Sequence, residues 1–144
     1  MDQAPAIERA KKRLETAGVA DRCNFTAGDI FAAVPVGGDV YLLSRVLHNW
    51  NDEAAVAILA NCRRAMGRDG VLLLIEAVLP ERADENEAAI RMDLHMLVLL
   101  GGRERTVAEY EALLAAAGYR RTRIVRTDPP GGIAIIEAAA SDVG

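Results

Sequence analysis

Two residues stand where a titratable side chain is costly to bury. His48 follows the apolar run 39–46 in the stretch LLSRVLHNWND, and Glu76 follows the apolar run VLLLI. A neutral imidazole accepts a proton near pH 7, whereas a buried carboxylate needs a partner. Open α/β folds place their ligands at the carboxyl ends of strands. Both residues are therefore candidates for proton-transfer chemistry, although a buried histidine satisfied by its neighbours would also explain His48 taken alone.

The elements that must position these residues alternate between helix and strand. Apolar residues at helical spacing predict four helices, at 5–17, 51–67, 86–99 and 106–118. Asn51 is the expected N-cap of the second helix, and Thr106 with Glu109 forms a capping box at the start of the last. Strands are predicted at 22–29, 39–46, 70–79, 119–127 and 132–140.

The short connector DPPGG, between the last two predicted strands, decides the architecture. It is too short to carry the chain back along the sheet, so these two strands run antiparallel, whether or not they are direct neighbours. The earlier strand–helix–strand units predict parallel neighbours. The expected fold is a mostly parallel α/β sheet with one reversed strand near its end. The nearly continuous apolar runs 39–46 and 70–79 predict strands covered on both faces.

Composition excludes several classes of function. The 144 residues suffice for one domain with a core. A formal net charge of −4 and the lack of a basic block argue against nucleic-acid binding. No apolar run is long enough to span a membrane or to serve as a signal peptide. Cys23 and Cys62 are far apart, which indicates reduced thiols in a cytoplasmic protein, and no Cys/His cluster predicts a metal site.

Four stretches carry a resemblance to a known family: GDIF at 28–31, LSRVLHNWNDE at 43–53, IEAVLP at 75–80 and GGRERTVAEYEALLAAAGY at 101–119. In this order and spacing they resemble the C-terminal half of the S-adenosylmethionine-dependent small-molecule O-methyltransferases. These are the plant caffeate and flavonoid enzymes and bacterial enzymes that methylate polyketides. The resemblance implies the Rossmann-like fold of class I methyltransferases, with a reversed final strand. Residues 1–144 are accordingly interpreted as a partial methyltransferase catalytic domain, its C-terminal portion.

The resemblance implies a binding site for S-adenosylmethionine. Asp2 matches the acid that binds the ribose hydroxyls through charge-assisted hydrogen bonds, although it could also belong to a disordered terminus. Asp29 and Ile30 match the pair that holds the adenine. Asp29 could instead simply end a strand, because Gly-Asp is common in turns. Ser44 matches a contact to the methionine part of the cofactor, and Trp50 matches a residue on the adenine side.

The resemblance also assigns the chemistry. His48 matches the general base, and Glu76 and Glu104 match two acids that orient its imidazole. Such a base takes the proton of a hydroxyl whose oxygen is aligned with the methyl group. A carboxylate at the far ring nitrogen fixes the tautomer and stabilises the imidazolium. Glu104 could instead form surface ion pairs with the arginines beside it.

Three further residues match positions that face the acceptor, a small molecule carrying a hydroxyl group. Asp93 and Met96 lie on the long predicted helix, Met96 as an adaptable apolar wall. Asn49 stands where the family usually has aspartate, and we interpret this as a change in substrate contacts. Some relatives with the same fold catalyse other reactions, including hydroxylation.

The resembled proteins are longer and begin with a helical dimerisation domain, followed by a strand with a glycine-rich turn. No GxGxxG motif occurs in this chain. The two strands without a counterpart here would lie between 22–29 and 39–46, which would leave unpaired sheet edges. The remaining strands could close up, two copies could pair, or another chain could supply the missing half. We therefore expect a homodimer or association with an N-terminal half, and weak cofactor binding by the chain alone. The alternative function is an inactive half that acts only by association.

Overall fold

The computed structural model describes residues 1–85, 87–127 and 132–141, so most of the DPPGG connector lies outside the described residues. The four predicted helices are formed close to their predicted bounds: α1 (Ala4–Thr16), α2 (Asp52–Ala65), α3 (Glu87–Leu100) and α4 (Val107–Ala116). The strands are β1 (Val40–Ser44), β2 (Val71–Leu79), β3 (Arg105–Thr106), β4 (Tyr119–Arg126) and β5 (Ile133–Ala140). Three 3₁₀ turns are η1 (Ala20–Arg22), η2 (Leu47–Asn49) and η3 (Ala83–Glu85).

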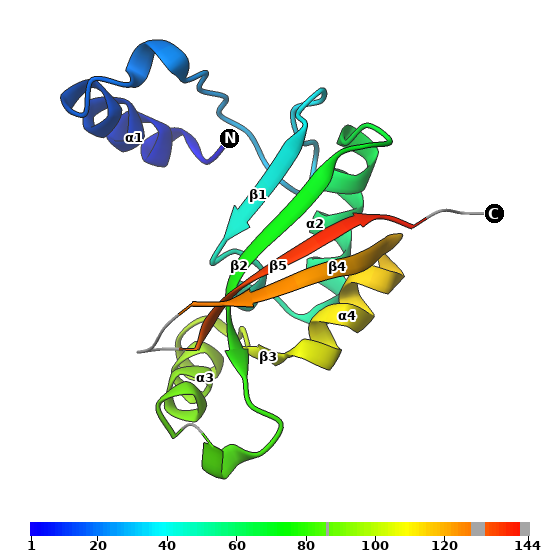
Figure 1. Cartoon of the computed structure of the whole chain (residues 1–144). Helices are drawn as coiled ribbons and strands as arrows, with labels where there is room; N and C mark the ends of the chain where they lie inside the picture. The colour runs from blue at the N-terminus through cyan, green and yellow to red at the C-terminus, as the bar shows by residue number, and fades with distance from the viewer. Residues whose placement is uncertain (86, 128–131, 142–144) are drawn as a thin grey trace.

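The sheet has the order β1-β2-β5-β4, and β3 pairs with the end of β2 (Figure 1). β1 and β2 are parallel, whereas β5 is antiparallel to both of its neighbours, β2 and β4. The predicted antiparallel relation of the last two strands is confirmed, and they are direct neighbours. β5 is thus the reversed strand in an otherwise parallel sheet. The parallel pairing aligns Ser44, the last residue of β1, with Ile75 of β2. Glu76 therefore lies within β2 beside the carboxyl end of β1, and not at the end of its own strand as expected.

The core lies between the sheet and the two helices α2 and α4, which cover one of its faces (Figure 1). Alternate strand residues point to one face of a sheet, and residues three or four apart share one face of a helix. Burying one large aliphatic side chain stabilises the fold by roughly 1.5–3 kcal/mol. Core residues include Tyr41, Leu43, Leu72, Leu74 and Ile136 from the strands and Ile58, Leu59, Tyr110 and Leu114 from the helices.

The prediction that the strands at 39–46 and 70–79 are covered on both faces is wrong for the part of the chain described here. Val40 and Leu42 of β1 are each 55% exposed, and Leu73 of β2 is only half-buried. Among the described helices, α1 lies beyond β1 and packs against its own turn η1 instead of the sheet (Figure 1). The apolar pattern of these strands therefore exceeds the burial that the described residues provide.

The prediction of a strand at 22–29 is also wrong. η1 is followed by extended chain that makes one isolated parallel bridge, between Asp2 and Ala27. In this bridge the Asp2 amide donates to the Thr26 carbonyl at 3.2 Å, and the Gly28 amide donates to the Asp2 carbonyl at 3.1 Å. No described strand pairs with the outer edge of β1, and the segment 22–29 does not pair with it either. The remaining strands thus do not close up among the described residues; association remains a prediction.

Helix caps confirm the predicted starts of two helices that frame the site. The Asn51 side chain accepts a hydrogen bond from the Ala54 amide at 2.9 Å. Thr106 and Glu109 form the reciprocal capping box at the start of α4. Such caps each stabilise by about 1 kcal/mol. In the described part of the chain, no helix has both the length and the apolar character required to cross a membrane.

Candidate active site

A sharp turn delivers His48 to the carboxyl end of β1. β1 ends at Ser44, and Arg45 then adopts a left-handed backbone conformation with φ 53°. Such a conformation is uncommon for a residue with a side chain. The Arg45 amide still donates to the Ile75 carbonyl at 2.9 Å, so the turn is tied to β2. The chain then forms η2, which contains His48, before Asn51 caps α2.

His48, Glu76 and Glu104 come together in the interior. Their residues are only 4%, 0% and 1% exposed. His48 Nδ1 lies 3.1 Å from Glu104 Oε1 and 4.0 Å from Glu76 Oε2. Glu76 Oε1 accepts hydrogen bonds from the amides of Val46 at 2.9 Å and Leu47 at 2.8 Å. Glu104 therefore binds the imidazole, while Glu76 mainly holds the backbone of the turn. The surface alternative for Glu104 is excluded by its burial.

The hydrogen bonds define what this group can do. With a proton on Nδ1 donated to Glu104, His48 Nε2 carries the lone pair, and no described residue bonds to it. Burial raises the pKa of Glu76, the Leu47 and Val46 amides and the His48 charge oppose this, and the Glu104 charge adds to it. The second carboxylate oxygens, Glu76 Oε2 and Glu104 Oε2, are buried without a hydrogen-bond partner among the described residues. The arrangement suits proton abstraction by Nε2. One nitrogen or oxygen atom from each of these three side chains lies within 4.8 Å of the other two, which is the grouping that the family resemblance implied.

Four of the five residues predicted to bind the cofactor line a hollow of about 440 Å³ between the N-terminal segment and β1. Asp2, Asp29, Ile30 and Trp50 all line it, together with Phe31, whose role sequence reasoning missed. The Phe31 and Trp50 rings pack edge to face, with centroids 4.8 Å apart and an interplanar angle of 85°. Ser44 is exposed and does not line this hollow. The signal for Phe31 was its position directly after the Asp29–Ile30 pair.

Polar and apolar groups of this hollow fit a nucleoside. Asp29 Oδ1 accepts from the Phe31 amide at 2.9 Å, and Asp2 Oδ1 accepts from the Gln3 amide at 2.7 Å. Each carboxylate keeps a second oxygen without a partner among the described residues, and that oxygen can accept from hydroxyl or amino groups. The hollow extends to Val46 and Trp50, which flank His48 in sequence. His48 itself is not among its lining residues.

The sequence is similar to known proteins along most of its length. Residues 1–120 match the O-methyltransferase domain family. The chain belongs to this family. It is 49% identical over 137 residues to the phenazine O-methyltransferase PhzM of Lysobacter antibioticus, covering 95% of this chain and 39% of that protein. The family prediction, made from four short stretches, is thereby confirmed.

Solved structures show the same relation for the O-methyltransferase fold. The mitomycin 7-O-methyltransferase MmcR superposes with a TM-score of 0.91 at 38% identity, over 96% of this chain and 40% of that one. The O-methyltransferase NcsB1 of neocarzinostatin biosynthesis superposes with a TM-score of 0.83 at 38% identity, over 96% of this chain and 40% of that one. NcsB1 was crystallised with S-adenosyl-L-homocysteine and 1,4-dihydroxy-2-naphthoic acid. These findings confirm the class I methyltransferase fold and S-adenosylmethionine as the family's cofactor. The chain spans about two fifths of the length of these relatives.

The three residues of this O-methyltransferase domain that are predicted to contact the acceptor also form contacts within the chain. Asp93 Oδ1 accepts from the Glu104 amide at 2.7 Å, so it ties α3 to the acid that binds His48. Asn49 Nδ2 donates to the Arg45 carbonyl at 3.3 Å and closes the η2 turn. Met96 is buried at 7% exposure, and its carbonyl accepts from the Gly102 amide at 3.2 Å. Their contact with an acceptor stays a prediction.

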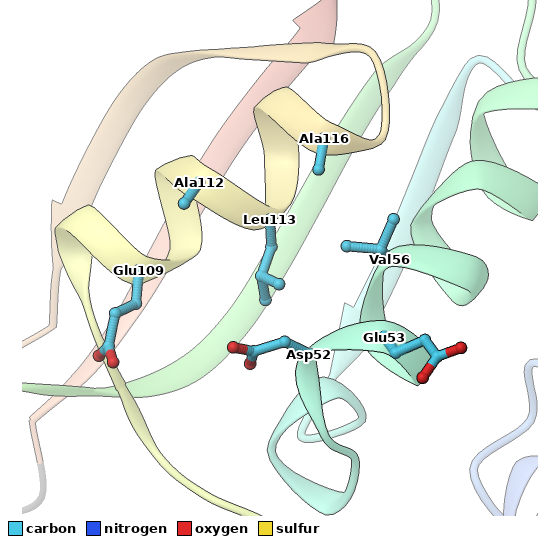
Figure 2. A pocket seen from close by; sticks show the side chains of 7 residues that line it. All are labelled: Asp52, Glu53, Val56, Glu109, Ala112, Leu113 and Ala116. Carbon is cyan, nitrogen blue, oxygen red and sulfur yellow. The ribbon is translucent and has the colours of Figure 1, made fainter.

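A second hollow, of about 400 Å³, lies between α2 and α4 (Figure 2). Val56, Leu113 and two alanines form its apolar part, and Asp52, Glu53 and Glu109 stand at one end. Two of these acids are already engaged, Asp52 with Arg105 and Glu109 with Thr106. The hollow is lined by neither histidine nor cysteine, so it offers no base comparable to His48.

Proposed function

We propose that this chain is the C-terminal catalytic portion of an S-adenosylmethionine-dependent O-methyltransferase that methylates a hydroxyl of a small aromatic or polyketide-like molecule. The observation that carries the proposal is the buried His48–Glu104 hydrogen bond of 3.1 Å, which leaves Nε2 without a partner among the described residues. A hollow suited to a nucleoside is lined by Val46 and Trp50, which flank His48 in sequence. When bound, S-adenosylmethionine supplies the methyl group as an electrophile on a sulfonium sulfur.

The residues of this chain then act on the acceptor. His48 Nε2 would take the proton of the acceptor hydroxyl as its oxygen receives the methyl group. Glu104 stabilises the resulting imidazolium through the Nδ1 hydrogen bond, and Glu76 keeps the turn in place through its two backbone contacts. Asp2, Asp29, Ile30 and Trp50 would hold the cofactor, with Ser44 near its methionine part. Asn49, Asp93 and Met96 would contact the acceptor.

The test compares His48→Gln with His95→Gln, since His95 is an exposed histidine on α3. Methyl transfer from labelled cofactor to a panel of phenols and aromatic acids is measured together with calorimetric cofactor affinity. A positioned base contributes on the order of 10²–10⁴-fold. His48→Gln should lose turnover in this range at unchanged cofactor affinity, whereas His95→Gln should keep it. A loss within about threefold for His48→Gln would show that His48 is not the base.

A second candidate function is favoured by the uncovered apolar residues of β1 and by the length relation to the relatives. In this case the chain is a half that works only when associated with another copy or with a partner chain. The same assays are run with the chain alone and after mixing with the N-terminal part of a full-length relative. Turnover that appears only on mixing supports association. Lack of cofactor binding in both conditions favours a non-catalytic role.

A further inference from the structure

Each residue of the segment Gly102–Arg105 contacts the turn that contains His48. Gly102 approaches so closely that an added Cβ would lie 2.1 Å from the His48 carbonyl oxygen. The Arg103 amide donates to the same carbonyl at 2.8 Å. The Glu104 side chain then binds His48 Nδ1. Three consecutive residues thus contact the turn. The fourth, Arg105, is buried and forms hydrogen bonds to the turn from the protein interior.

Arg105 is a fully buried arginine whose bonds concentrate on the same turn. Its guanidinium donates to the carbonyl of Leu47 at 3.1 Å and to the carbonyl of Trp50 at 2.8 Å. These carbonyls lie on either side of His48 in the sequence. The Nε and second Nη groups also donate to Asp52 Oδ1, at 3.0 and 2.8 Å. Asp52 begins α2, directly after the turn.

The chemistry of arginine explains this choice of contacts. Its guanidinium is planar, permanently charged and offers five donors in a fixed fork, whereas lysine offers a rotatable point charge. A buried charge of this kind is tolerated only when it is paired and hydrogen-bonded, and Asp52 with the two carbonyls meets this need. Arg103 also lies 3.8 Å from Asp52, but its side chain is 42% exposed and bonds mainly to Glu109.

We propose that Arg105 is a positioning residue for the base: with Asp52 it clamps the carbonyls flanking His48, so that Nδ1 stays on Glu104 and Nε2 faces the acceptor. This inference rests on the proposed role of His48. An anchor that only joined β3 to α2 would need the Asp52 pair alone. The two carbonyl contacts let Arg105 fix the backbone on both sides of His48, and through that backbone the position of the ring that Glu104 binds.

The experiment reads the His48 ring directly in the 144-residue chain. In a His95→Gln background, nitrogen NMR of the imidazole reports a single histidine. The parent should show the tautomer with its proton on Nδ1 and slow exchange of that proton. Arg105→Lys keeps the charge but loses the fork, so the Nδ1 proton should exchange faster and the other tautomer should become populated. Arg121→Lys, on the exposed face of β4 and paired with Glu111, is the matched control and should leave the spectrum unchanged.

Asp52→Asn serves as the second variant because the Asp52 side chain is 57% exposed and the asparagine oxygen can still accept from Arg105. Asp52→Asn should move the His48 signals in the same direction by a smaller amount. It therefore tests the proposal even if Arg105→Lys does not fold. In turnover assays Arg105→Lys should lower kcat by about 10²-fold, as a misplacement near 1 Å can, at unchanged cofactor KM. A His48 spectrum identical to the parent in the folded variants would overturn the proposal. Altered spectra in a chain without any turnover would support the clamp and count against the proposed function instead.

Discussion

Glu76 and Glu104 both approach His48, but their hydrogen bonds differ, and this difference predicts different effects of the same substitution. Glu104→Gln removes the charge that faces Nδ1, so turnover should fall on the order of 10²–10⁴-fold. Glu76→Gln keeps an oxygen for the amides of Val46 and Leu47, so its loss should be smaller. The measurement is kcat for both variants at saturating cofactor. Equal losses, or a larger loss for Glu76→Gln, would contradict this division of roles.

Glu76 should also make stability depend on pH. Burial raises its pKa above the ordinary 4.5 in the folded chain. As pH rises above this value the unfolded chain releases the proton first, so the free energy of unfolding falls until the folded carboxyl also ionises. Urea unfolding from about pH 4 to pH 8 should therefore show the parent losing stability relative to Glu76→Gln. Glu53→Gln, at an exposed glutamate in the first turn of α2, is the control for the substitution itself. A constant difference between the parent and Glu76→Gln would refute the shift.

Individual residues of the site could be predicted where the residues next to them in the sequence indicated their position in the fold. His48 follows β1, and Glu76 lies in β2 directly after the last residue that pairs with β1, so the parallel pairing of the two strands brings these residues together. The sequence does not predict the role of Arg105, because its polar neighbours Glu104 and Thr106 give no sign that this arginine is buried. Its partners are Leu47, Trp50 and Asp52, more than fifty residues earlier in the chain. Only the folded chain shows that its charge is enclosed.

At the scale of elements, the close contact between the Gly102 segment and η2 gives a further prediction. A Cβ at Gly102 would meet the backbone of His48 at 2.1 Å and of Asn49 at 2.9 Å, so one segment must move. Overpacking of this kind costs about 1–3 kcal/mol, and displacement of the turn should also lower turnover. Gly102→Ala is compared with Gly67→Ala, where the added Cβ meets nothing within 4 Å. Equal stability and activity of the two variants would show that η2 and this segment are not coupled.

Helices were more predictable than the first strand for a physical reason. Helix hydrogen bonds and caps are local, so the Asn51 cap and the Thr106–Glu109 box could be predicted from adjacent residues and are confirmed. A strand requires a partner that sequence does not name. The segment 22–29 has a strand-like composition, but the described chain offers it only the bridge to Asp2. Covering a strand also requires partners that the sequence does not name. The apolar runs 39–46 and 70–79 therefore did not ensure that both faces of these strands are covered.

For the whole molecule, the uncovered apolar surface predicts association with a second copy. Val98 on α3 is 81% exposed, and Leu94 and Leu97 of the same helix are 55% and 59% exposed. Contiguous exposed apolar residues of this kind mark interaction surfaces. The chain also spans only about two fifths of the relatives' length, so surfaces buried in those proteins can lie open here.

Light scattering coupled to gel filtration tests this association with a matched pair of substitutions. Val98→Lys places a charge on the exposed face of α3, whereas Val125→Lys changes an exposed valine of β4, at the opposite edge of the sheet from β1. Burying a lysine charge in an apolar contact is costly, so Val98→Lys should lower the mass-average molecular weight while Val125→Lys should leave it at the value of the parent. Adding the N-terminal part of a full-length relative should compete with self-association if both use α3. A parent chain that is monodisperse as a monomer and binds S-adenosylmethionine tightly would rule out the requirement for a second copy, because the hollow beside β1 would then be sufficient by itself.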